Sequence, residues 1–522
     1  MIARRTHPWA GARPRILGAV TAFALLFLGA WAPPAAADGG LFEGSVGATG
    51  TAVRWYVVEV GRPGTVTALL DWSNASADLN LYLQDPLRRT VASATSTTQR
   101  PETVTASATI MGRWWIGVRA RSGASSYTLS VSYPGDVWVE PSGVDRANEA
   151  GIAQVTRSWG TFVHDYDLDG DPDFLYNRHS GSEMVLYAND GTGHFQQVLP
   201  GLFPWNDRHD CTWGDVNADG IPDAYCAVGA SAPKYIPKVN ELWLGNADGS
   251  LTRAPDAWGA EDPLGRGREP ALFDANGDGL LDLFVSNLAP RADGQPTPNR
   301  FYLQDPPGAF RSAPEWGVDL QINSVCAEMA DFDRDGYPDL AVCAGGAAGG
   351  LKLYRNVAGT RFEDVAAQLG VTGIWCDVEW QDLDLDGQID LLLMSRTLFQ
   401  VMLQQPDGTF RISYRRGMDQ AGCTTSGGGD RIATGDVNHD GFPDVYLLYS
   451  GYSNGAYNLP DVFLVNDGTG QGFFRAAIPN VTGGSGQSVA AIEADGDPPT
   501  EFLVTNGRAK FTGPIQLIDF GD

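Results

Sequence analysis

One nine-residue pattern, Asp-x-Asp/Asn-x-Asp-Gly-x-x-Asp, recurs along most of the chain, each time followed by an apolar strand-like run. The six matches begin at Asp165, Asp215, Asp274, Asp331, Asp382 and Asp436. Their spacing is 50 to 59 residues, and an altered seventh segment at 493–497 lies at the next expected interval. Six such segments at near-constant spacing cannot arise by chance, so the sequence predicts a repeat array.

The size of the repeat indicates the architecture. Residues 137–522 number 386, which gives about 55 per unit for seven units, the size of a four-stranded propeller blade. The 64 Gly and 32 Pro residues are spread through the chain, as expected for many turns and few long helices. We therefore expect an all-β fold in which residues 137–522 form a seven-bladed β-propeller.

The spacing within the pattern suits one hard cation. Oxygens at positions 1, 3 and 5 converge when the loop curls, Gly at position 6 permits the turn, and the position 7 carbonyl and position 9 carboxylate complete the shell. Oxygen-only donors favour calcium over zinc or copper. An EF-hand would need Glu at position 12 and flanking helices, whereas position 12 here is Tyr, Cys, Val or Leu in β-type runs. We expect about six calcium sites, in loops between two strands.

The predicted metal ligands share the same five positions in each loop, with position 7 contributing its backbone carbonyl. They are Asp165, Asp167, Asp169, Asp171, Asp173, Asp215, Asn217, Asp219, Ile221, Asp223, Asp274, Asn276, Asp278, Leu280, Asp282, Asp331, Asp333, Asp335, Tyr337, Asp339, Asp382, Asp384, Asp386, Gln388, Asp390, Asp436, Asn438, Asp440, Phe442 and Asp444. Because every loop repeats these ligands and none carries a distinctive extra group, we expect structural calcium ions.

Residues 41–133 carry short β-type runs separated by turns. Six predicted strands in about 90 residues, without helical periodicity, indicate a β-sandwich. The segment also resembles the bacterial pre-peptidase C-terminal domain. The residues that carry this resemblance are 78–86, 101–104, 112–118 and 126–129. The resemblance implies a non-catalytic accessory module of a secreted enzyme or surface protein.

The repeat region resembles the FG-GAP/VCBS repeat family, the integrin-α-like seven-bladed propellers, through segments such as 331–340 and 353–356. The six repeats lack literal Phe-Gly and Gly-Ala-Pro signatures, so they are nearer to the VCBS style and an integrin-like ligand is not carried over. The family closes its ring by pairing the two chain ends in one blade. We therefore expect residues 137–144, as an outer strand, to join residues 515–520 in the seventh blade.

Residues 1–37 have the order of a secretory signal peptide. Four Arg residues precede an apolar run at 16–32, and Ala35–Ala37 offers a cleavage site. An uncleaved membrane anchor is the alternative, because 17 apolar residues are at the lower limit for a span. The net charge of −27 excludes nucleic acid as a partner. We expect an exported, secreted or surface-bound monomer with no transmembrane segment after cleavage.

The cysteines test the hairpin geometry. If each loop joins antiparallel strands, paired positions have a constant sum in the motif numbering. Cys211 and Cys226 are positions −3 and 12 of the second loop, Cys326 and Cys343 are positions −4 and 13 of the fourth, and both sums are 9. The last pair follows by elimination, and buried free thiols are the alternative because bridges between paired strands are geometrically demanding. The predicted disulfides are Cys211–Cys226, Cys326–Cys343 and Cys376–Cys423.

A ligand-binding face is predicted from strand direction. Because strands alternate, the connections between second and third strands, and between blades, emerge opposite the calcium loops. Several are long, at 229–241, 288–300 and 449–461, and such length is typical of function or disorder. They carry aromatic and Arg side chains of the kind found in binding hot spots. The predicted ligand-binding residues are Trp205, Arg208, Tyr235, Arg291, Tyr452 and Tyr457.

The sequence contains no His-Glu-x-x-His, no Gly-x-Ser-x-Gly and no Gly-rich phosphate loop with Lys. We therefore favour a non-enzymatic binding or adhesion protein that recognises an extracellular protein or glycan. The alternatives are a secreted polysaccharide lyase or hydrolase on a propeller scaffold, and a structural envelope component. The fold alone does not decide among these three functions.

Overall fold

The computed structural model describes residues 38–521, except for residues 48–51, 157, 159, 178–182, 230–238, 289–296, 346–349, 419–430, 450–459, 480–485, 497–499 and 508–511. The predicted signal peptide, residues 1–37, lies outside the described residues. Within the described part of the chain, no helix has the length and apolarity needed to cross a membrane.

The N-terminal region is a β-sandwich of two four-stranded antiparallel sheets, ordered β1-β8-β3-β6 and β2-β7-β4-β5. Its strands are β1 (Asp38–Val46), β2 (Arg54–Val60), β3 (Gly64–Trp72), β4 (Asp78–Gln84), β5 (Thr90–Ala94), β6 (Glu102–Ala108), β7 (Gly112–Ser122) and β8 (Ser125–Tyr133). Alternate residues of β8 are buried, as expected for a strand with one face on a core. The sequence identified six of these strands and missed β1 and β5.

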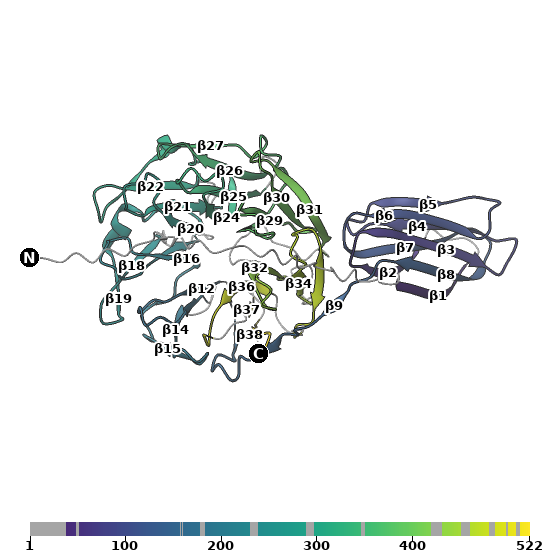
Figure 1. The fold of residues 1–522 in the computed structure, drawn as a ribbon, viewed down its shortest axis with the longest axis horizontal. Coiled ribbons are helices and arrows are strands. Elements are labelled where there is room, and N and C mark those ends of the chain that lie inside the picture. Colours follow the sequence, from purple (N-terminus) through teal and green to yellow (C-terminus); the bar gives the residue numbers. More distant parts are fainter. Residues whose placement is uncertain are drawn as a thin grey trace, which may run out of the picture. The chain divides into compact units, whose positions relative to one another are not determined.

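Seven further sheets follow (Figure 1). Five of them have four antiparallel strands in chain order, and the other two have five strands. Blades 1 to 3 are β12–β15 (Thr161–His164, Asp173–Tyr176, Val185–Asn189, Phe195–Val198), β16–β19 (Arg208–Gly214, Asp223–Val228, Glu241–Gly245, Leu251–Arg253) and β20–β23 (Gly267–Phe273, Asp282–Asn287, Arg300–Gln304, Phe310–Ser312). Blades 4 and 5 are β24–β27 (Asn323–Ala330, Asp339–Gly345, Gly350–Asn356, Phe362–Asp364) and β28–β31 (Asp377–Gln381, Asp390–Met394, Leu398–Gln404, Phe410–Gly417). Blade 6 is β32–β35 (Ile432–Gly435, Asp444–Leu447, Val462–Asn466, Phe473–Ala476), and blade 7 contains β36–β38 (Gly486–Ile492, Glu501–Asn506, Gly513–Asp519).

These sheets form a closed ring. The first strand of each blade contacts the first strand of the next, and β36 contacts β12 to complete the circle. Aromatic side chains fill the space between blades, as where Phe301 of blade 3 packs against Phe362 of blade 4 with ring centroids 5.5 Å apart. Two short 3-10 helices, η1 (Pro255–Gly259) and η2 (Pro314–Trp316), add to this packing. The predicted all-β fold, a sandwich followed by a propeller, is confirmed.

The closure differs in detail from the prediction. The outer strand of blade 7 is β10 (Val144–Asp145), which pairs with β38, and β11 (Val155–Thr156) also pairs with β38. However, β9 (Trp138–Val139) pairs in parallel with β35 and so extends blade 6. The chain crosses the open edge of β35 before it reaches blade 7, and Pro141 has no backbone N–H to continue that pairing.

Two disulfides confirm the hairpin arithmetic. Cys211 and Cys226 are bonded and lie opposite each other in β16 and β17. Cys326 and Cys343 are bonded and lie opposite each other in β24 and β25. Cys376 is also disulfide-bonded, and Cys423, its predicted partner, lies outside the described residues.

The sandwich is joined to the outer strand of blade 5. The backbone N–H of Met111 donates to the Arg415 carbonyl at 2.9 Å, and the N–H of Gly417 donates to the Met111 carbonyl at 2.7 Å. Met111 is 2% exposed and belongs to a hydrophobic cluster with Tyr414 and Met418. A Cβ on Gly417 would lie 2.1 Å from Cβ of Pro86, so the junction depends on glycine at this position.

We predict that Gly417→Ala loosens the junction. The added methyl group overlaps Pro86, so proteolytic cleavage of the connection at residues 134–137 should accelerate on the order of fivefold, which corresponds to about 1 kcal/mol. Limited proteolysis followed by mass spectrometry measures this rate. Gly39→Ala is the control, because its Cβ would meet only the Val131 carbonyl oxygen, at 3.7 Å. Equal cleavage rates for the two variants would contradict the prediction.

Candidate functional site

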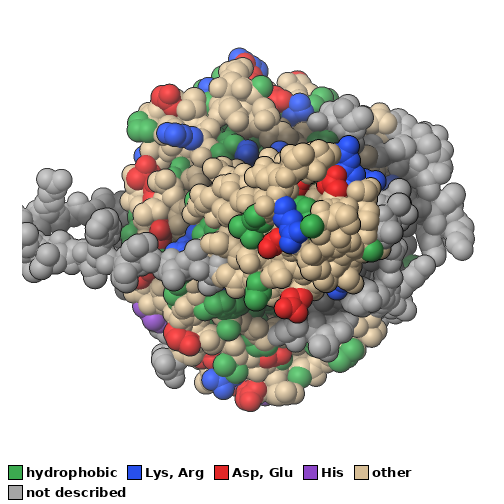
Figure 2. Space-filling model, turned by 90° about the vertical axis from the view of Figure 1, so that its right-hand side faces the viewer, with side chains coloured by type: hydrophobic (Ala, Val, Ile, Leu, Met, Phe, Trp, Pro, Cys, Tyr) green, Lys and Arg blue, Asp and Glu red, His purple; other side chains and the backbone are tan. Residues whose placement is uncertain are grey.

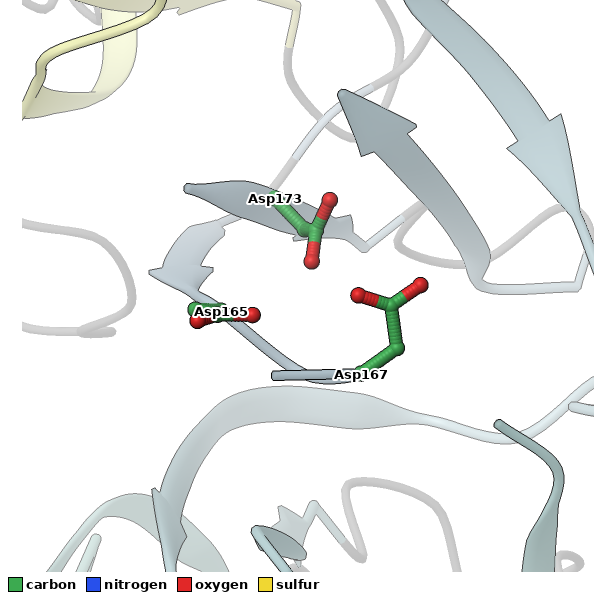
Figure 3. A group of neighbouring side chains, drawn as sticks. All are labelled: Asp165, Asp167 and Asp173. Atoms are coloured by element: carbon green, nitrogen blue, oxygen red, sulfur yellow. The ribbon is translucent and has the colours of Figure 1, made fainter. Parts of the chain in front are cut away.

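Each of the six complete motifs lies in the turn between the first and second strands of a blade. In all six, the position 6 Gly N–H donates to the position 1 Asp at 2.8–3.1 Å. In the three loops with Asp at position 3, carboxylate oxygens of positions 1, 3 and 9 lie within 4.8 Å of one another. Figure 3 shows one such group, in which the carboxylates of Asp165, Asp167 and Asp173 border a common space. These three acidic groups could hold a metal ion.

The position 9 aspartate begins the second strand and is the most constrained residue of each loop. Its side chain is at most 1% exposed in all six blades. One oxygen accepts the position 2 N–H at 2.9–3.1 Å. The other accepts an N–H from the end of the third strand at 2.7–2.9 Å. One carboxylate therefore joins three segments of its blade.

The position 5 aspartate has a different role in this structure. Its oxygen accepts the position 7 N–H at 2.8–3.1 Å in all six loops. It does not belong to the three acidic groups formed by positions 1, 3 and 9. The bond fixes the turn that carries the position 7 carbonyl, which is the predicted backbone ligand.

Burial shifts the ionisation of the position 9 carboxyls. Loss of solvent raises the pKa of Asp223 to about 6, and it raises the pKa of the other five, such as Asp339 and Asp444, to about 7 from 3.8. Neighbouring loop carboxylates raise these pKa values further, whereas the accepted backbone N–H groups lower them. The loops thus concentrate negative charge that a bound cation would compensate.

The altered seventh motif keeps the hydrogen bond but changes the donor set. Glu501 stands at position 9, and its carboxylate accepts the Ala494 N–H at 2.9 Å, as Asp does elsewhere. Burial raises the pKa of Glu501 to about 8. Position 1 is Glu493, which accepts the Thr500 hydroxyl at 2.8 Å. Asp497 of this motif lies outside the described residues.

An amide side chain at the end of the third strand connects neighbouring blades. In four blades this side chain donates to the position 2 carbonyl of the preceding blade's motif at 2.6–2.9 Å. The four residues are Asn189, Asn356, Gln404 and Asn466. Their own backbone N–H groups are the ones that hold the position 9 aspartates. The sequence analysis included Asn356 only in the segment 353–356 that resembles the repeat family. It did not predict the hydrogen bond to the neighbouring blade.

A cavity of 420 Å³ lies at the centre of the ring, lined by the first strands of all seven blades. The carboxyl side chains of Asp210, Glu269, Glu328 and Glu379 line it. Among the described lining residues there is no Lys or Arg. His164 and Trp213 stack at its wall with ring centroids 5.7 Å apart, and burial lowers the pKa of His164. The cavity is therefore acidic, and sequence spacing gave no signal for it because its residues come from separate blades.

The predicted ligand-binding residues have different surroundings. Trp205 is 48% exposed. Arg208 is buried, and its guanidinium lies 2.7 Å from the Glu241 carboxylate and donates to the Pro204 carbonyl at 2.9 Å. It therefore holds the blade-to-blade connection in place. Tyr235, Arg291, Tyr452 and Tyr457 lie outside the described residues.

Comparison with known protein families finds similarity in three segments of the repeat region. The FG-GAP-like repeat family matches residues 165–226, 331–393 and 382–447. No curated protein matches the sequence.

Among solved structures, the chain is similar to an Agrocybe aegerita lectin described as recognising non-reducing terminal N-acetylglucosamine, with 16% identity, 77% of this chain and 92% of that chain covered, and a TM-score of 0.40. It is also similar to a Bacillus licheniformis rhamnogalacturonan lyase, with 12% identity, 91% of each chain covered and a TM-score of 0.35. A mitogen from Yersinia pseudotuberculosis matches 19% of this chain and 89% of its own, with 18% identity and a TM-score of 0.16.

We predict a pH-dependent effect of chelation. Between the unfolded pKa of 3.8 and the folded values of about 6 to 7, the folded state holds more protons, so metal-free stability falls as pH rises through that window. A chelator should lower the melting temperature of the propeller by more than about ten degrees at about pH 8, and by less at about pH 5.5. Scanning calorimetry with and without excess calcium measures this. A chelated protein that melts higher at the alkaline pH would contradict it.

We also predict that Asn356→Ala destabilises the ring. The change leaves the Ala275 carbonyl without this donor and removes a second bond, to the Pro338 carbonyl at 3.1 Å. The free energy of unfolding should fall by about 1–3 kcal/mol, as measured by urea denaturation in calcium. In the control Gln405→Ala, the lost amide reaches only the Leu403 carbonyl of its own blade, and we expect a change below about 0.5 kcal/mol. Equal losses in both variants would contradict the role of Asn356.

Proposed function

We propose that the protein is an exported calcium-binding β-propeller that acts as a binding or adhesion module for an extracellular protein or glycan. The observation that carries the proposal is the sixfold repetition of one loop geometry on one edge of the blades. Loops that repeat one geometry stabilise the scaffold. The connections on the opposite edge can then differ in sequence and length, as in other folds that carry ligand sites on loops.

Calcium is the proposed metal because the donor set fits it. The four side-chain positions of the six loops supply 21 carboxylates and three Asn amides, and hard oxygen donors without nitrogen or sulfur suit calcium. The ion would compensate the charge of these carboxylates and join the loop to the second strand through position 9. Its proposed role is structural.

Export is supported by two features. Residues 1–37 have the order of a signal peptide, and cross-strand disulfides join the hairpins of blades 2 and 4. Disulfides persist outside the reducing cytoplasm, where calcium is also available at the concentrations that extracellular modules need, on the order of 10⁻⁴–10⁻³ M. We infer that the protein is released or retained at the cell surface.

The proposed ligand face is the one opposite the calcium loops. Trp205, on the connection from blade 1 to blade 2, exposes an aromatic side chain on that route, and Arg208 and Glu241 anchor the connection beneath it. A fixed backbone that presents an exposed aromatic group is what a binding hot spot requires. The long connections at 229–241, 288–300 and 449–461 belong to the same proposed face.

The acidic central cavity favours a second candidate function. Carboxyl groups converging from four blades are the side chains that a polysaccharide hydrolase or lyase would use. This candidate requires product release. Incubation with polysaccharides, followed by assays for new reducing ends or unsaturated ends, distinguishes it from binding alone.

The binding proposal is tested with a glycan array and a pull-down of extracellular proteins, both in calcium. For a ligand found there, we predict that the triple variant Trp205→Ala, Tyr235→Ala, Tyr452→Ala lowers affinity at least about tenfold, because hot-spot aromatics contribute most of the binding energy. The matched control is Leu168→Ala with Leu385→Ala, since these side chains are 54% and 51% exposed within the calcium loops. If only the control variant loses affinity, the ligand binds on the face of the predicted calcium loops, and the proposed ligand face is wrong.

A further inference from the structure

A cavity of 540 Å³ lies where the sandwich meets blades 5 and 6. Glu59 and Arg113 line it from the sandwich, Asp136 and Trp138 from the connection, and Arg416 and Arg475 from the propeller. The backbone bonds between Met111 and the strand β31 fix the walls relative to each other. The volume is in the range of small-molecule sites, which occur preferentially at domain interfaces.

The charge in this cavity is opposite to that of the chain. Three guanidinium groups face two carboxylates, Glu59 and Asp136, in a protein whose net charge is −27. Figure 2 shows acidic and basic side chains scattered over the face drawn there. A local excess of arginine in an acidic protein attracts an anion that the rest of the surface repels.

Some N–H groups of Arg416 and Arg475 make no hydrogen bond to the protein residues described. Arg416 is 2% exposed, and one terminal nitrogen lies 2.7 Å from Glu59 while the other is 3.5 Å from Asp136. Nε of Arg416 and Nε of Arg475 have no hydrogen-bond acceptor among the described residues, and Nη1 of Arg416 makes no hydrogen bond beyond its 3.5 Å ion pair with Asp136. Leaving such buried N–H groups unmet is unfavourable. An oxygen-rich anion in the cavity would satisfy them.

Trp138 gives the cavity an apolar surface. Its side chain is 60% exposed, although it belongs to a strand paired with blade 6. The Arg475 guanidinium lies 4.9 Å from its ring centroid, which orients both groups. An exposed indole beside fixed hydrogen-bonding groups suits a flat, hydroxylated ligand.

We propose that this junction cavity binds an acidic saccharide, a sugar of the hexuronate class. Its carboxylate would accept from Arg416 and Arg475, its hydroxyls would donate to Glu59 and Asp136, and its ring would lie against Trp138. A singly charged carboxylate on a hydroxylated ring matches a mixture of arginine and carboxylate groups. A phosphate dianion would meet repulsion from Asp136 and Glu59. Tyr449 and Pro460, at the two ends of the connection 449–461, also line the cavity, so the site borders the proposed ligand face. The proposal rests on Arg416, Arg475 and Trp138 and not on that face.

The test is isothermal titration of the full chain in calcium with trimers of galacturonate, glucuronate and mannuronate. At least one trimer should bind, and its fully methyl-esterified form should bind at least about tenfold more weakly, because it keeps the sugar but loses the charge. Affinity should also fall with added salt. Failure of all three trimers, or equal binding of the ester, overturns the proposal. Acetate that binds as tightly as the trimer would show an anion site without sugar recognition. That result would also overturn the proposal.

Variants locate the site. Arg475→Gln and Trp138→Ala should each weaken the trimer at least about tenfold, and Arg475→Lys should weaken it less, because it keeps the charge but not the planar fork. The control is Arg311→Gln, an exposed arginine paired with Glu315 in blade 3, which should change nothing. Unchanged affinity in both Arg475→Gln and Trp138→Ala overturns the location, and melting curves establish that each variant is folded. Ligand-face variants at Trp205 should leave trimer binding intact, which separates this proposal from the previous one.

Discussion

The propeller depends on one buried carboxylate per blade. The position 9 aspartate begins the second strand and accepts N–H groups from both the first turn and the end of the third strand. A glycine-bearing loop without this side chain could still turn, but nothing would hold it against the third strand. Two oxygens on a short side chain meet that geometry in six blades, and Glu501 meets part of it in the seventh.

The same few atoms also connect the blades. The residue whose backbone N–H holds the aspartate uses its side-chain amide to reach the preceding motif, as Asn356 does with Ala275. The acidic loop, the blade and the ring are therefore connected by one path of hydrogen bonds. A cation bound to a loop would stabilise these hydrogen bonds as well as its own turn. The charge of the acidic loops and the stability of the ring are therefore coupled.

The sequence predicted the features that depend on the spacing of nearby residues. The nine-residue pattern placed the loops between strands, and the antiparallel hairpin placed Cys211 opposite Cys226, because both relations are set within some twenty residues. Contacts between distant segments left no such trace. The ion pair of Arg208 with Glu241, the pairing of Trp138 with blade 6 and the approach of Arg416 to Glu59 all join residues that lie far apart in the sequence. The identity of the metal, the identity of the ligand and the binding roles of Tyr235, Arg291, Tyr452 and Tyr457 stay predictions.

Blade 7 takes its outer strand from residues 144–145 and its remaining strands from the last part of the chain. Synthesis therefore produces six blades before the strand that completes the circle exists. Until the last part of the chain is made, blade 1 lacks its neighbour blade 7 and β10 lacks its partner β38. For the exported protein that we propose, this final joining would take place after the chain has crossed the membrane, in a compartment that allows the disulfides to form.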